Sequence, residues 1–155
     1  MLAQELEDEE SEANGADSAI AADSVEIQLF NLANRDRAAH GLPPLRLDYQ
    51  LLDVARVRAA AQAGLPSLSH LDASGQLAFV RLISDSEVNY RLVGENLARV
   101  SNPAQTAAER AEEALMNSPA HRANILEPTF DSLIVGTASD SAGQIVFAQI
   151  FRAGS

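Results

Sequence analysis

The sequence contains no cysteine, no tryptophan and no lysine. The lack of cysteine excludes disulfides, thiol nucleophiles and cysteine-bound metal ions. The lack of lysine leaves arginine as the only fixed side-chain cation and removes the side-chain amine that a Schiff-base mechanism needs. No apolar run approaches the roughly 20 residues that cross a bilayer, so we expect no transmembrane segment.

Negative charge is concentrated at one end of the chain. The formal net charge is −11, but residues 1–24 hold eight acidic residues and no basic one, which leaves 14 acidic residues and 11 arginines in the rest. A dense acidic segment repels itself, so we interpret residues 1–23 as a disordered arm or linker, with an acidic docking tail as the alternative. The nearly neutral remainder offers no basic face for a phosphate backbone, which argues against a nucleic-acid partner. The opening MLAQELEDEE also lacks the apolar core of a signal peptide.

The hydrophobic pattern of residues 24–153 predicts one domain with helices before strands. Asp23 and Glu26 fit a capping box at the start of the first helix, in which we expect the polar run 34–37 to face solvent. LVGENLARV alternates like a strand, and the last thirty residues are typical of a hairpin. Further helical patterns cover 48–63, 76–83 and 103–117. This order favours an α+β domain whose small sheet is covered by helices.

Three polar residues could carry chemistry, although no local motif joins them. His70, Glu95 and His121 are 25 and 26 residues apart. Glu95 shares a strand face with apolar neighbours, and a buried carboxylate is costly unless it is paired or hydrogen-bonded. His121 follows the helix-breaking Ser118-Pro119, where a side chain can enter a cleft. The residues alone leave each histidine open between structural packing, metal binding and catalysis.

Five ordered segments resemble the bacterial branch of the CAP superfamily, which includes cysteine-rich secretory, antigen 5 and pathogenesis-related 1 proteins and is also called SCP-like. The segments are LFNLANRDRAAHGLPPLRLDYQLLDVARVRAA, GENLA, MNSPAHRANIL, VGTA and VFAQIF. The resemblance covers about residues 25–152. It implies that residues 24–153 form a three-layer α-β-α sandwich around a small antiparallel sheet, in a secreted or extracytoplasmic protein.

The resemblance also implies a surface cleft formed by His70, His121 and Glu95, with Asn96 and Arg122 bracing its walls. In some relatives such histidines bind a divalent metal, so His70 and His121 are the expected ligands of an ion such as zinc, with a carboxylate orienting one ring.

The chain departs from many eukaryotic members at one cleft position. Those members carry a second acid three residues after a tryptophan. Here Leu115 stands at the tryptophan position and Ser118 at the position of the acid. The cleft is therefore short by one carboxylate.

Two functions and one structural interpretation follow. We favour a monomeric binding module whose cleft takes a divalent metal, or a small ligand such as a peptide, a lipid or part of a surface polymer. The alternative is a metal-dependent, peptidase-like hydrolase in which Glu95 and His121 are the candidate catalytic residues. The third possibility is that the polar cluster only ties the turn at 118–126 to the strand that carries Glu95.

Overall fold

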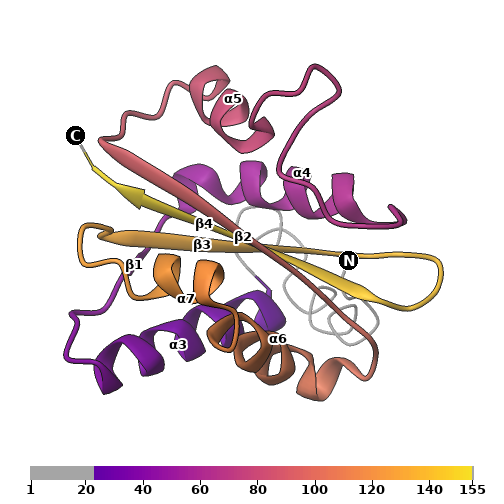
Figure 1. Ribbon diagram of the computed structural model, residues 1–155, viewed down its shortest axis with the longest axis horizontal. Helices are drawn as coiled ribbons and strands as arrows, with labels where there is room; N and C mark the ends of the chain where they lie inside the picture. The colour runs from indigo at the N-terminus through magenta and orange to yellow at the C-terminus, as the bar shows by residue number, and fades with distance from the viewer. Residues whose placement is uncertain (1–22, 155) are drawn as a thin grey trace.

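The structure, a computed structural model, describes residues 23–154 and has two layers of helices around one sheet (Figure 1). One face of the sheet is covered by α4 (Leu52–Gln62) and α5 (Ala78–Asp85), and the other by α3 (Ser24–Ala39), α6 (Ala107–Met116) and α7 (Pro119–Ile125). The 3-10 turns η1 (Tyr49–Leu51) and η2 (Ala104–Thr106) lead into α4 and α6. The predicted α+β, three-layer α-β-α sandwich is confirmed. No helix within residues 23–154 has the length and apolar content needed to cross a membrane.

The sheet has the strand order β1-β3-β4-β2. Its strands are β1 (Arg46–Leu47), β2 (Leu92–Val100), β3 (Ser132–Ser139) and β4 (Ile145–Ala153). β4 pairs antiparallel with both β2 and β3, whereas β1 pairs parallel with β3. The sheet is therefore mixed: its three longer strands pair antiparallel, as predicted, and the two-residue β1 adds a parallel pairing at one edge. Parallel strands need a crossover connection, which the chain between β1 and β3 supplies.

Side chains of β4 alternate between two cores. Phe147 and Phe151 are fully buried in the core beneath α3, α6 and α7. Ile150 points the other way and packs with Leu51 and Ile83 beneath α4 and α5. This alternation, which has a period of two residues, fixes which residues of each paired strand face which helical layer.

The predicted capping box is present at the start of α3. Asp23 Oδ1 accepts from the Glu26 backbone N–H at 2.9 Å, and Glu26 Oε1 accepts from the Asp23 N–H at 2.9 Å. The Glu26 carboxylate also accepts from the Thr137 backbone N–H at 2.9 Å, which ties α3 to β3. Apart from Asp23, the predicted acidic arm lies outside the described residues.

Arg37 is fully buried, which corrects the expectation that residues 34–37 all face solvent. Leu29, Ala33 and Arg37 lie four residues apart and share the buried face of α3. Arg37 Nη1 donates to the carbonyl oxygens of Ile125 at 2.8 Å and Glu127 at 2.9 Å. The side chain therefore holds the end of α7, the helix that carries His121.

Candidate functional site

Glu95 lies on β2, the edge strand of the sheet, and its side chain is fully buried on the face that α4 covers. Arg58 of α4 donates from Nε to Glu95 Oε2 at 2.7 Å and from Nη2 to Glu95 Oε1 at 3.2 Å. Arg58 is itself 3% exposed. A buried carboxylate is tolerated when it is paired and hydrogen-bonded, and this two-point contact supplies both conditions.

His70 lies in the connection between α4 and α5, with Nδ1 2.7 Å from Glu95 Oε1. The ring is 44% exposed, so one edge contacts the buried carboxylate while the other reaches solvent. Arg58 Nη2 also donates to the Ser69 carbonyl at 2.8 Å, and the Ser69 N–H donates to Gln62 Oε1 at 2.8 Å. The connection is therefore held at the residue before His70, and Glu95 orients the ring.

His121 is placed by the break between α6 and α7. Ser118-Pro119 ends the first helix and starts the second, with proline in the first turn. Ser118 Oγ lies 2.7 Å from His121 Nδ1. Burial lowers the pKa of His121, and the nearby His70 lowers it further, so the neutral ring is favoured.

Asn96 connects the strand to α7. Its Nδ2 donates to the His121 carbonyl at 3.0 Å and to Gln149 Oε1 at 3.0 Å, while Asn124 Nδ2 donates to Asn96 Oδ1 at 2.9 Å. Consecutive strand residues point to opposite faces. Glu95 therefore holds the His70 segment of one layer, and Asn96 holds the His121 segment of the other.

β2 therefore contacts His70 through Glu95 and the His121 backbone through Asn96, whereas Arg122 extends toward His40. Arg122 is exposed, and its Nη2 lies 3.5 Å from His40 Nε2. One residue along a helix turns the side chain by about 100°, so Arg122 leaves the direction that His121 takes.

Sequence reasoning missed Arg58, the residue that neutralises Glu95. A signal was present, because Arg58 lies three residues after Ala55 and seven after Leu51, on the buried stripe of its helix. An arginine in an apolar stripe near a strand that carries an apparently buried glutamate indicates an ion pair between them.

The donor set for a metal ion is sparse. Within residues 23–154, no group of three or more His, Asp or Glu side chains is arranged to hold a metal. Both rings engage Nδ1 in contacts, His70 with Glu95 and His121 with Ser118, which leaves Nε2 of each ring as the possible ligand atom. Arg58 already occupies both oxygens of Glu95. Two imidazoles, with a carboxylate behind one of them, have the donor chemistry that Zn²⁺ accepts, but they are fewer protein ligands than structural or catalytic zinc sites have.

The chain matches the model of a known protein family. The model of the cysteine-rich secretory protein family (CAP) matches residues 30–151. An uncharacterized protein of Bacillus subtilis, YkwD, is 31% identical over 111 residues, which is 72% of this chain and 41% of the relative.

Solved structures of similar fold come from extracellular and surface proteins. An extracellular protein of Bacillus anthracis that contains an SCP domain superposes with a TM-score of 0.64 at 27% identity, over 83% of this chain and 40% of that one. An outer surface protein of Borrelia burgdorferi superposes with a TM-score of 0.67 at 18% identity, over 82% and 90%. This second likeness concerns the fold alone. The chain spans about two fifths of the length of both Bacillus proteins.

Proposed function

Because the chain belongs to the cysteine-rich secretory protein (CAP) family, we propose that it is an extracytoplasmic binding module whose His70–Glu95–His121 cleft takes a divalent metal or a small ligand. The location is inferred from the similar Bacillus anthracis structure, which is described as that of an extracellular protein. The observation that carries the proposal is the state of Glu95. Its side chain is fully buried, and both oxygens are occupied by Arg58.

An occupied carboxylate favours binding over catalysis. A general base needs an oxygen that can approach the proton to be removed, either directly or through one water. Glu95 instead contacts His70 at Nδ1 and directs the remaining ring nitrogen outward. This is the role that carboxylates commonly have behind metal-binding histidines. In this proposal a divalent ion such as Zn²⁺ takes one nitrogen each from His70 and His121.

Zinc titration tests the metal part of the proposal. The chain is first stripped with a chelator and then titrated by calorimetry, with His70→Ala and His121→Ala measured alongside. We expect a single site in the wild type and no measurable site in either variant, because each variant removes one of only two protein ligands. His40→Ala is the matched control. His40 is exposed at the end of α3, where its Nδ1 lies 2.9 Å from the Asp36 carbonyl oxygen.

The controls decide the result. The metal site is contradicted if the wild type gives no heat of zinc binding. It is also contradicted if the double His70→Ala/His121→Ala variant still gives this heat. An equal loss in His40→Ala contradicts the assignment to the cleft.

A hydrolase is the second candidate, and one contact favours it. Ser118 Oγ lies 2.7 Å from the Nδ1 of His121, whose lowered pKa keeps the ring available as a base. A metal-dependent, peptidase-like reaction would use the same cleft, with Glu95 and His121 as the catalytic candidates. Turnover of a mixed peptide and ester library, lost in both Glu95→Gln and His121→Ala, would support this function. Turnover lost in Ser118→Ala and His121→Ala but kept in Glu95→Gln would assign the reaction to the serine instead.

A further inference from the structure

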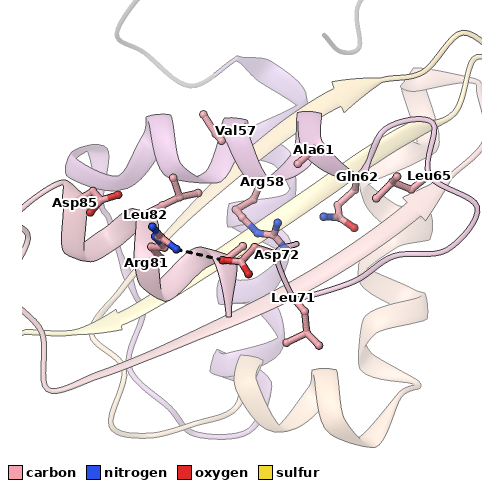
Figure 2. Close-up of a pocket in the computed structure, with 11 residues that line it drawn as sticks. Val57, Arg58, Ala61, Gln62, Leu65, Leu71, Asp72, Arg81, Leu82 and Asp85 are labelled. Carbon is pink, nitrogen blue, oxygen red and sulfur yellow. Dashed lines mark ion pairs between the residues drawn. The ribbon is translucent and has the colours of Figure 1, made fainter. Parts of the chain in front are cut away.

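A cavity of about 320 Å³ opens beside the His70–Glu95 contact, between α4, α5 and the connection that joins them (Figure 2). Its size lies at the lower end of the range for small-molecule sites, roughly 300–1,000 Å³. Apolar side chains form most of its wall, namely Val57, Ala61, Leu65, Leu71, Ala78 and Leu82. His70 immediately precedes one of these wall residues, so the cavity and the cleft are adjacent.

The wall of this cavity concentrates the exposed apolar side chains of the protein. Val57 is 50% exposed, Leu65 40% and Leu71 52%. These three are half of the large apolar side chains that are exposed within residues 23–154, and all three line one cavity. Single exposed apolar residues are ordinary, but a group around a concave site indicates a surface that is covered by a ligand.

The polar groups of the cavity restrict the chemistry of that ligand. The Arg58 guanidinium lies in the wall (Figure 2). Its charge is paired with that of Glu95, behind the wall. Its Nη1 has no hydrogen-bond partner among the residues that the structure describes, so it can still donate to a neutral oxygen.

The rim disfavours an anionic ligand. Arg81 lies 4.0 Å from Asp72, and Asp85 adds a second carboxylate, which leaves the rim with more acidic than basic side chains. A fatty-acid carboxylate would meet this negative rim and an arginine that is already paired. An uncharged apolar group attached to an amide carbonyl meets neither obstacle.

We propose that this cavity binds the apolar side chain of an extended peptide, with the peptide's carbonyl accepting from Arg58 and its backbone continuing past His70. The inference rests on the proposed binding function, because it names a ligand class for the cavity beside the His70–Glu95 contact. Leucine or phenylalanine fits the apolar wall, whereas aspartate is repelled by the rim.

Nuclear magnetic resonance titration tests this proposal on the full, ¹⁵N-labelled chain. The probes are acetylated and amidated Ala-X-Ala tripeptides with leucine, phenylalanine or aspartate at X. We expect saturable shifts of amides around the cavity for leucine and phenylalanine, and none for aspartate. Leu71→Asn should weaken the leucine peptide about fivefold or more. Leu92→Asn is the matched control, because Leu92 is 39% exposed but lies outside the cavity.

Three results would overturn the proposal. One is the absence of saturable shifts with any tripeptide, and another is an unchanged affinity in Leu71→Asn. The third is binding of an uncharged monoacylglycerol at these amides without binding of the tripeptides, which would assign the cavity to acyl chains.

The metal site can be tested independently of peptide binding. The double His70→Ala/His121→Ala variant should lose zinc and keep the leucine tripeptide within about twofold, because the apolar wall is intact. Zinc binding without tripeptide binding contradicts the peptide proposal alone, and the reverse contradicts the metal site alone.

Discussion

Glu112 of α6 is 1% exposed and lies beside Asp36 of α3, in an interface where two carboxyl groups face each other. Burial raises the pKa of Glu112 to about 9, and Asp36 adds to the rise because a protonated Glu112 can donate to it. The folded protein thus keeps a proton that the unfolded chain releases near the ordinary value of 4.5. Stability must therefore fall as pH rises between these two values.

The magnitude follows from proton linkage. Each pH unit in this window costs about 1.4 kcal/mol, so unfolding free energy should drop by about 2 kcal/mol between about pH 7 and pH 8.5. Glu112→Gln keeps the shape but cannot ionise, so we expect it to remove this drop. The chain has no cysteine, the side chain that ordinarily titrates in this window.

Urea unfolding followed by circular dichroism at both pH values measures the effect. Glu113→Gln is the control, because it makes the same substitution at an exposed neighbour on the same helix. Equal slopes for the wild type and Glu112→Gln would refute the assignment of a buried, protonated carboxyl group. A slope lost equally in Glu113→Gln would point to net charge instead.

Two further substitutions test the packing around the site. Arg58→Met leaves the Glu95 carboxylate buried without its partner and should lower the unfolding free energy, measured with urea, by about 3–5 kcal/mol. The double variant Arg58→Met/Glu95→Met should recover most of this loss. A double variant no more stable than Arg58→Met would contradict the ion pair. Gly136→Ala would place a Cβ 2.4 Å from the Ala55 backbone carbon and should lower stability by about 1–3 kcal/mol. Gly94→Ala, whose nearest contacts are side-chain atoms at 3.1 Å, should cost less, and the reverse order would refute the close approach of α4 to β3.

The layers of this fold follow from sequence because their signals are local. The capping box at Asp23, the alternation of residues 92–100 and the final hairpin each depend on neighbours in the chain, and the structure contains all three. The parallel pairing of β1 cannot be predicted in this way, because a strand of two residues has no detectable hydrophobic period. Its partner strand lies more than eighty residues away.

The buried position of Arg37 differs from the sequence-based expectation, and the cause of the difference is physical. Charge alone suggests that Arg37 faces water, yet helical spacing puts it on the stripe of Leu29 and Ala33. The carbonyl oxygens that accept from Arg37 belong to residues 125 and 127, which lie 88 and 90 residues later in the chain. Long-range acceptors of this kind cannot be located from spacing, so a buried arginine is recognised only by its stripe. The same reasoning applies to Arg58 and Glu95.

The consecutive pair on β2 also constrains how the sheet assembles. A shift of β2 by one residue against β4 would turn Glu95 toward α7 and Asn96 toward Arg58. The Glu95 carboxylate and the Arg58 guanidinium would then lie on opposite faces of the sheet, each without its partner. Among residues 23–154, β2 pairs with β4 alone, so this pairing is the one at which a shifted register is penalised. Glu95 and Asn96 therefore also favour the observed register of β2 against β4.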